Sequence, residues 1–140
     1  MKVLLDLNVL MDVLQRREPF FASAASVCEW GEKRQNTLAI PAHAVTTVSY
    51  IVRKSAGANA ESKALDWLLK NFAVIPSDVA VFRLARTFGM EDFEDAVVAA
   101  SAEMSGCSYV ITRNVQDFLG SSVPAIQPVE FLSMQGMLAN

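Results

Sequence analysis

Short apolar runs alternate with longer segments of helical periodicity along this chain. The first run, residues 3–5, is apolar at every position and ends at Asp6. A run of this kind predicts a strand that is buried on both faces of a sheet. Similar short runs predict strands over residues 38–41, 73–76 and 108–112. Prolines border a fifth run, residues 124–128, which therefore suits the edge of the sheet.

Helices are predicted between the strands, where apolar residues recur at helical spacing. Asn8 is expected to cap the first helix, and Gly89 and Gly106 are expected to follow the ends of two later ones. The predicted helices span residues 9–14, 19–35, 43–54, 60–71, 78–88, 91–105 and 129–138. Strands that alternate with helices predict a parallel sheet covered on both faces. We therefore expect an α/β fold, a three-layer α/β/α sandwich with a central parallel sheet of four to five strands, formed as a single domain by residues 1–140.

The composition is that of a globular protein, with 52% hydrophobic and 19% charged residues. A net charge of −3 excludes a generally basic nucleic-acid binder but leaves room for a local basic rim. Cys28 and Cys107 belong to no Cys-x-x-Cys pair, so we expect buried free thiols in a reducing compartment. The sequence has no visible signal peptide and no apolar run of roughly 20 residues, which predicts a cytoplasmic protein without membrane contact.

Acidic residues occur at three places that the predicted fold brings together. Asp6 follows the first strand. The other two places are the start of the helix before the fourth strand, with Asp92 and Asp95, and the segment after that strand, with Asn114 and Asp117. Strand carboxyl ends and helix amino ends share one edge of such a sheet, so we expect these side chains to meet there. Asn114 and Asp117 are expected on one side of their segment if it is helical.

Clustered carboxylates repel one another unless a cation joins them, and oxygen ligands favour Mg²⁺ or Mn²⁺ over zinc. Such an ion activates water and neutralises charge during attack on a phosphate ester. Because His43 is the single histidine, a histidine-based phosphodiesterase is not expected. Taken one at a time, Asp92 and Glu94 are typical of helix capping or solvation, and Asp12 is expected to be a solvated acid of the first helix.

Three segments resemble motifs of the PIN-domain family of metal-dependent ribonucleases, which includes the toxin components of many bacterial toxin–antitoxin pairs. Residues 4–10, LLDLNVL, are similar to the family's opening DTNVL motif, with Leu7 in place of threonine. Residues 95–100, DAVVAA, resemble its D-x-x-I-A-A helix, and residues 110–118, VITRNVQDF, resemble its VTRN/D-x-x-DF block. The likeness covers nearly the whole chain and preserves the order and spacing of the motifs.

The resemblance implies an endoribonuclease that depends on Mg²⁺ or Mn²⁺ and hydrolyses RNA phosphodiester bonds with a metal-activated water. It implies that Asp6 and Asp95 coordinate the metal, that Asp117 or Asn114 contacts it directly or through water, and that Asp92 lies close by. The supporting residues that it implies are Asn8, which would brace the loop after Asp6, and Thr112, which would orient a ligand or water. Toxins of this family imply a small antitoxin protein as partner and a homodimer.

One position departs from the family pattern. PIN domains usually carry a glutamate on the helix after the second strand, in a context similar to E-L-x-x-V-L-R. Residues 47–53 read TVSYIVR at the matching place, so Thr47 stands where that acid is usual. A hydroxyl can hold a water on the metal but brings no charge, so weaker metal affinity is expected. Asp92 is a candidate to compensate for the missing carboxylate.

Basic residues in loops or at helix ends can line a path for the RNA backbone. Arg113 is the best placed, beside the acidic residues, and Arg53 and Lys54 are further candidates for RNA contact. Ordinary surface charge is the alternative explanation for each of them. Arg16 and Arg17 have the same two interpretations.

Two other functions remain open from the sequence. A catalytically weak or inactive PIN scaffold that binds RNA or a protein partner is suggested by Thr47. A phosphatase of the haloacid-dehalogenase type also begins with an acid after its first strand, but Asn8 occupies the place of that enzyme's second aspartate. The aromatic residues of the helices, Phe20, Phe21, Trp30 and Trp67, are expected to pack either inward or across a dimer interface.

Overall fold

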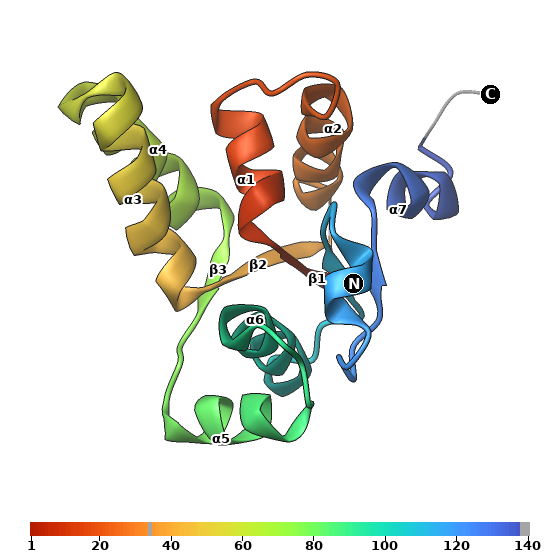
Figure 1. The fold of residues 1–140 in the computed structure, drawn as a ribbon. Helices are drawn as coiled ribbons and strands as arrows, with labels where there is room; N and C mark the ends of the chain where they lie inside the picture. Colours follow the sequence, from red (N-terminus) through yellow and green to blue (C-terminus); the bar gives the residue numbers. More distant parts are fainter. Residues whose placement is uncertain (34, 138–140) are drawn as a thin grey trace.

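A five-stranded parallel sheet forms the centre of the computed structural model, which describes residues 1–33 and 35–137 (Figure 1). The strands are β1 (Lys2–Leu5), β2 (Thr37–Pro41), β3 (Ala73–Ile75), β4 (Tyr109–Ile111) and β5 (Ala125–Ile126). Their order across the sheet is β3-β2-β1-β4-β5, and every neighbouring pair is parallel. Because β1 is the central strand, the residue that follows it, Asp6, lies in the middle of the carboxyl edge.

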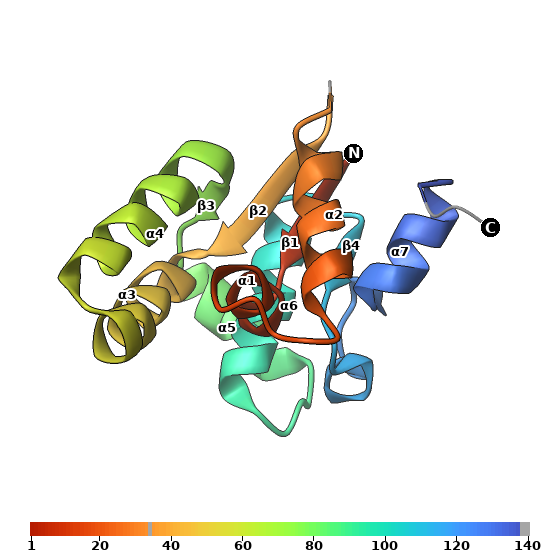
Figure 2. The same cartoon turned by 90° about the horizontal axis from the view of Figure 1, so that it is seen from above.

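Helices cover both faces of the sheet. They are α1 (Leu7–Leu14), α2 (Phe21–Gly31), α3 (Ala42–Ala56), α4 (Ala58–Asn71), α5 (Val79–Thr87), α6 (Phe93–Met104) and α7 (Pro128–Met134), with the 3₁₀ helix η1 (Val115–Phe118) after β4. Helices α5 and α6 lie on one face, and the remaining α-helices lie on the other (Figure 1). Figure 2 shows α1 between the α3–α4 pair and the α2–α7 pair. The expected three-layer α/β/α sandwich is therefore confirmed.

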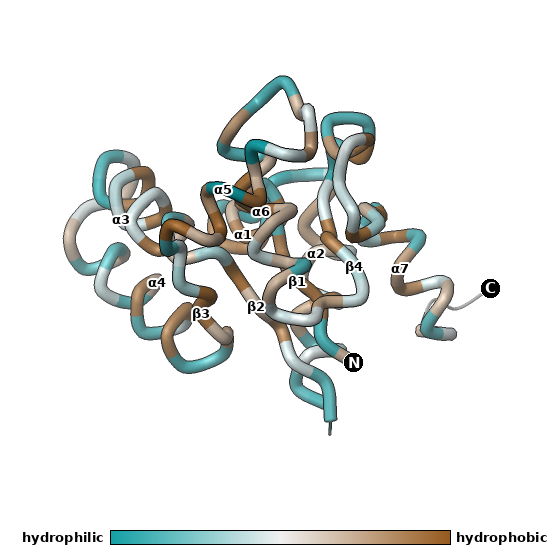
Figure 3. Tube along the Cα trace, turned by 90° about the horizontal axis from the view of Figure 1, so that it is seen from below, coloured by the Kyte–Doolittle hydropathy of each residue, from teal (hydrophilic) through white to brown (hydrophobic). Residues whose placement is uncertain are grey.

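The core follows from the alternation of side chains along β1. Val3 and Leu5 point into the larger core beneath α1, α2, α3, α4 and α7, while Leu4 points into the core beneath α6. All three side chains are fully buried, as expected for a central parallel strand. Hydrophobic segments accordingly gather at the centre of the molecule in Figure 3. Among the described residues, no helix is long and apolar enough to cross a bilayer.

The predicted strands are all present, and β5 lies at the sheet edge as its prolines indicated. Most helix boundaries differ from the prediction by one or two residues, and the ends of the second and the last helix differ by more. The second helix ends at Gly31 instead of continuing to residue 35, because the chain needs the residues after it to turn back into β2. The last helix ends at Met134, and the predicted end at position 138 lies outside the described residues.

Candidate active site

The Asp6 side chain caps the helix that follows β1. Its Oδ1 accepts a hydrogen bond from the Leu7 backbone N–H at 2.8 Å, and α1 begins at Leu7. The prediction that Asn8 caps this helix is therefore wrong. Asn8 lies inside the first turn, because the carboxylate one residue beyond the strand already accepts from the free helix N–H.

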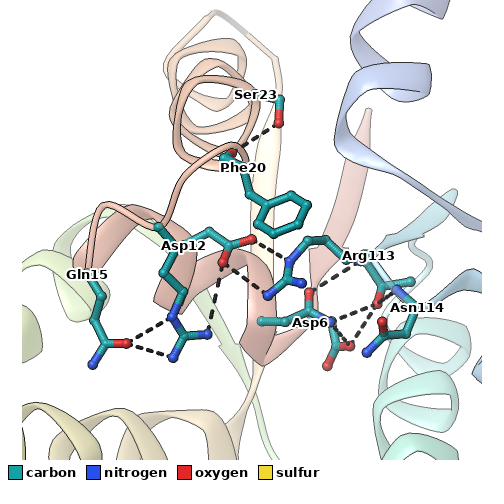
Figure 4. A network of polar contacts seen from close by, with 10 residues as sticks. Asp6, Asp12, Gln15, Phe20, Ser23, Arg113 and Asn114 are labelled. Atoms are coloured by element: carbon teal, nitrogen blue, oxygen red, sulfur yellow. Dashed lines mark hydrogen bonds and ion pairs between the residues drawn. The ribbon is translucent and has the colours of Figure 1, made fainter.

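Two side chains hold the second oxygen of Asp6 (Figure 4). The Thr112 hydroxyl donates to Asp6 Oδ2 at 2.9 Å, and the Asn8 amide donates to the same oxygen at 3.3 Å. Thr112 Oγ1 also accepts from the Asn8 amide at 3.3 Å and from the Asn114 backbone N–H at 3.1 Å. These bonds join the amino end of α1 to the segment that follows β4, and they fix the orientation of the carboxylate.

Burial dominates the electrostatics of Asp6. The residue is only 9% exposed, and this burial raises the pKa of its carboxyl group above the ordinary value. The hydrogen bonds from Thr112 and Leu7 lower the pKa, while the negative charge of Glu94 raises it further. A buried carboxylate beside another acid is electrostatically unfavourable unless positive charge compensates it.

Asp95 is the second carboxylate of the site. Burial, followed by the negative charges of Asp6, Asp92 and Asp117, raises the pKa of Asp95 from 3.8 to about 6. Asp92 caps α6 by accepting from the Asp95 backbone N–H at 3.0 Å, which was its expected role when considered alone. Acids from three distant segments therefore act on one another at the carboxyl edge of the sheet.

A cavity of about 580 Å³ opens beside these acids, between the start of α6 and η1. Asp92, Asp95 and Asp117 line it, together with Glu91, Gln116 and Leu119. Asn114 lines a different cavity. The expectation that Asn114 and Asp117 lie on one side applied to a helical segment, and this condition is not met at Asn114. The helix η1 begins only at Val115, and the non-helical backbone of Asn114 breaks the helical spacing between the two residues.

His43 and Glu94 also approach this edge, and the sequence did not predict their contact. His43 Nε2 lies 3.5 Å from Glu94 Oε1, which links the start of α3 to the start of α6. Thr47 lies one turn further along α3, and its hydroxyl donates to the His43 carbonyl at 3.0 Å. In this structure the Thr47 hydroxyl is therefore bonded to its own helix. The only available signal for Glu94 was its place in an acidic helix start.

The prediction that Asp12 is solvated is wrong, because this residue is completely buried. Arg113 Nε donates to Asp12 Oδ2 at 2.7 Å, and Arg113 Nη2 donates to Oδ1 at 3.2 Å (Figure 4). The Arg113 guanidinium also lies over the Phe20 ring, 4.0 Å from its centroid. A signal was available: Asp12 follows Asn8 by one helical turn and shares its face. The structure thus pairs Arg113, the leading candidate for RNA contact, with a buried carboxylate.

Arg53 and Lys54 lie at the opposite end of α3 from the acids. Arg53 lies eleven positions after Ala42 at the start of the helix, which corresponds to about 16 Å along its axis. Arg53 pairs with Glu61 at 3.2 Å, and the Lys54 ammonium lies 5.7 Å from the centroid of the Tyr50 ring. The acidic edge and this basic helix end are therefore separate surfaces, and contact of Arg53 and Lys54 with RNA stays a prediction.

The donor chemistry of the acidic edge fits a divalent cation such as Mg²⁺ or Mn²⁺. The candidate ligands Asp6, Asp95 and Asp117 offer only oxygen. Burial first, and then the negative charges of Asp6, Asp92 and Asp117, raise the pKa of Asp95, and a cation would offset both effects. In the described part of the chain, no three such groups already lie at coordination distance from one point.

Fold and site together define an α/β protein with an acidic centre at the carboxyl edge of a parallel sheet. The sequence model of the PIN domain matches residues 2–116. The chain therefore belongs to the PIN-domain family, for which nuclease activity dependent on a divalent metal is the general function. Family membership leaves no reason to retain the haloacid-dehalogenase alternative. A comparison with curated protein sequences gave no match.

Several solved structures share the fold. VapBC-1 from nontypeable Haemophilus influenzae has a TM-score of 0.71 at 14% identity, covering 92% of this chain and 99% of that one. A toxin–antitoxin complex from Klebsiella pneumoniae has a TM-score of 0.69 at 24% identity, covering 90% and 97%. Mycobacterium tuberculosis VapC20, described as a sarcin–ricin-loop-cleaving toxin, has a TM-score of 0.62 at 14% identity, covering 77% and 86%. At these identities the likeness establishes the fold.

Proposed function

We propose that this protein is an endoribonuclease that depends on Mg²⁺ or Mn²⁺ and hydrolyses RNA phosphodiester bonds. The observation that carries the proposal is that Asp92 and Asp95 from the start of α6 and Asp117 from η1 line one cavity, at the sheet edge where Asp6 follows β1. Carboxylates brought together in this way are the usual ligands for a metal that acts on phosphate esters. Membership of the PIN-domain family supports the same conclusion.

In this proposal Asp6, Asp95 and Asp117 hold the cation, with Asp92 beside them. The bound cation supplies activation of water and neutralisation of charge on the phosphate. Thr112 and Asn8 keep Asp6 in place through hydrogen bonds of 2.9 and 3.3 Å. A carboxylate that is already oriented needs little rearrangement when the substrate binds, which favours catalysis.

The biological role that we propose is the toxin of a toxin–antitoxin pair, with a small antitoxin protein as partner. Two of the similar structures reported above are described as VapBC-1 and as a toxin–antitoxin complex, and another toxin is described as cleaving the sarcin–ricin loop. These descriptions support RNA as substrate and a protein inhibitor as partner. Co-expression with the product of a neighbouring small reading frame should relieve growth inhibition if the proposal is right.

Substitution of Asp6 tests the proposed activity. Asparagine is also a good helix cap, so Asp6→Asn removes the charge while keeping a side chain that can cap α1. We expect the purified wild-type protein to cleave RNA with Mn²⁺ and Asp6→Asn to lose at least about a hundredfold in rate. Asp66→Asn on the exposed side of α4 is the matched control and should retain full activity. Equal cleavage by Asp6→Asn and the control would contradict the assignment.

The inactive scaffold is the second candidate, and it is favoured by Thr47, which brings no carboxylate to α3. A measurement of metal binding distinguishes the inactive scaffold from the metal-dependent ribonuclease. A ligand that binds only the folded protein stabilises it, by about 2.7 kcal/mol at a concentration one hundred times its Kd. We expect Mn²⁺ to raise the Tm of the wild-type protein and to leave the Tm of Asp6→Asn nearly unchanged. An unchanged wild-type Tm would favour the scaffold.

A further inference from the structure

The segment that follows β4 contributes to the walls of a second cavity as well as to those of the acidic one. The second cavity has a volume of about 350 Å³ and is lined by Pro19, Phe20, Arg113, Asn114, Gln127 and Pro128, among others. Its walls come from the turn before α2, the segment after β4 and the start of α7, so three distant parts of the chain form it. The volume is at the small end of the range for ligand pockets, which suits a single small group.

The segment after β4 separates the two cavities. Asn114 lines the second cavity and Asp117 lines the acidic one, with η1 beginning between them. Asn114 is also close to Asp6, because its backbone N–H donates to the Thr112 hydroxyl, and that hydroxyl donates to Asp6. A strand of RNA with one phosphate at the carboxylates would therefore carry a neighbouring nucleotide towards the second cavity.

Phe20 and Arg113 provide flat surfaces in this cavity. Phe20 is 38% exposed, and the Arg113 guanidinium lies 4.0 Å from the centroid of its ring. Two hydrogen bonds to Asp12 hold the guanidinium in place (Figure 4). Unpaired RNA bases stack on aromatic rings and on guanidinium planes, and a fixed surface loses little conformational entropy when it binds one.

Charge decides which part of a nucleotide suits this cavity. Asp12 neutralises Arg113, so the guanidinium attracts a phosphate weakly. Arg113 covers one face of the Phe20 ring, which leaves the opposite face of the ring for a base. Asn114 and Gln127 are exposed at the cavity, and neither side chain forms a capping hydrogen bond to the helix that it precedes. An amide offers both donors and an acceptor, which matches the edge of a nucleobase.

We propose that this cavity binds one unpaired nucleobase of the RNA, next to the phosphate that is cleaved. Phe20 and Arg113 form the stacking surface, and Asn114 and Gln127 contact the edge of the base. This inference rests on the proposed ribonuclease function, and it adds that the substrate is single-stranded at the cut and that the enzyme selects a base there.

The test measures binding, so it does not depend on cleavage. The probes are fluorescent RNA heptamers, each with a single abasic nucleotide at a different position. Their binding to the Asp6→Asn variant, which is expected not to cleave them, is measured by fluorescence anisotropy. We expect one position at which loss of the base weakens binding by about tenfold, which corresponds to one stacked base. Phe20→Ala in the same Asp6→Asn background should weaken binding of the intact RNA by a similar factor. In this variant, removal of the base at the sensitive position should have no further effect on binding.

Three further variants make the result specific. Phe20→Tyr keeps an aromatic ring and should keep the sensitivity, while Gln127→Ala should change which base is preferred at that position. Tyr50→Ala removes an exposed aromatic side chain of α3 outside the cavity and should leave the abasic profile unchanged. Because Phe20 and Tyr50 are both exposed, the Tm values of their variants should match that of the parent protein.

The outcomes separate this inference from the proposed function. If the parent binds RNA but Phe20→Ala keeps the abasic sensitivity, or if no position is sensitive, the cavity is not a base site although the ribonuclease proposal stands. If Phe20→Ala weakens only the binding of a protein partner, the occupant is that partner and the inference is wrong. If no heptamer binds at all and the wild-type protein cleaves no RNA, both proposals fail.

Discussion

The Asp6 carboxylate combines two roles at the level of the single residue. One oxygen caps α1, and the other accepts hydrogen bonds from Thr112 and Asn8. Hydrogen bonds to a charged group contribute roughly 1.5–3 kcal/mol, which offsets part of the unfavourable free energy of burying the charge. The position therefore keeps a carboxylate ionisable and oriented inside a protein edge from which water is largely excluded.

Asp95 should make the stability of the metal-free protein depend on pH. Its pKa is raised in the fold, from 3.8 to about 6, so its stabilising contribution is complete below pH 3.8 and is lost as the pH rises through about 6. We expect Asp95→Asn to have a higher Tm than the wild-type protein at pH 7 in EDTA. The difference should be modest, because solvent screens a half-buried carboxylate, and it should vanish near pH 4.

Thermal unfolding at several pH values measures this effect. Asp66→Asn serves again as the control, because it removes an exposed carboxylate outside the site and should leave the pH dependence of the wild-type protein unchanged. A Tm for Asp95→Asn that is below that of the wild-type protein at pH 7 would contradict the raised pKa.

At the level of elements, the ion pair between Arg113 and Asp12 connects the segment after β4 to α1. Arg113 and Asp12 are 101 residues apart in sequence, and Asp12 is completely buried beneath the guanidinium. Arg17 adds a weaker contact, with its Nη1 at 4.0 Å from Asp12 Oδ1. The pair positions Asn114 and Thr112, so the geometry of Asp6 depends on it indirectly.

Removing one partner of this pair should be strongly destabilising. Arg113→Met leaves Asp12 buried without its main counter-charge, and we expect a loss of about 3 kcal/mol in the free energy of unfolding. The double variant Arg113→Met with Asp12→Leu should recover much of that loss, because no buried charge remains. Urea denaturation measures both, and Arg17→Met should cost less than about 1 kcal/mol. Equal losses for the two arginines would show that the pair is not the main contact.

The helix α3 allows a direct test of the missing family glutamate. Thr47 lies one turn beyond His43, whose imidazole contacts Glu94 at the acidic edge. A carboxylate at this position should strengthen the negative field of the site, and we expect Thr47→Glu to bind Mn²⁺ more tightly by about tenfold. Calorimetry measures the change. Thr46→Glu adds the same charge at the exposed neighbouring position, and a similar gain there would mean that general charge, not position, is responsible.

At the level of the whole molecule, the cores on the two faces of the sheet leave its carboxyl edge for the acidic residues. The aromatic side chains that were expected either inside or at an interface differ in how deeply they are buried. Trp30 is 4% exposed and packs edge-on against Phe131, with ring centroids 4.9 Å apart, so it belongs to the core. Trp67 contacts Phe72 in the same way at 5.0 Å. Trp30 is therefore not available to an interface, whereas Trp67 is only partly buried.

We nevertheless expect a homodimer, on the basis of family membership. A chain of 15.3 kDa should then give twice that molar mass by light scattering at micromolar concentration. The exposed aromatic side chains of Phe82 and Phe93, with centroids 6.2 Å apart, are present on the surface of α5 and α6. A mass equal to one chain across the micromolar range would contradict the expectation.

The sequence by itself determined the elements and the order of the acidic residues. Apolar runs define buried strands, helical spacing defines the helices, and the alternation of the two implies a parallel sheet whose carboxyl edge gathers Asp6, Asp95 and Asp117. These are local signals, because each depends on neighbouring residues and on the geometry of one strand or helix. The position of Asp6 is such a local signal. The apolar run before Asp6 is enough to predict that this residue lies at the end of a buried strand.

Only the tertiary structure decided how the side chains pair. It buried Asp12 against Arg113, separated Asn114 from Asp117 into two cavities and brought His43 to Glu94. It also set the raised pKa of Asp95. Each of these results depends on distances between groups far apart in the chain, and the Coulomb energy and the burial of a charge vary steeply with such distances. A periodic pattern fixes which edge a residue reaches, but the partner that it meets there is fixed by packing.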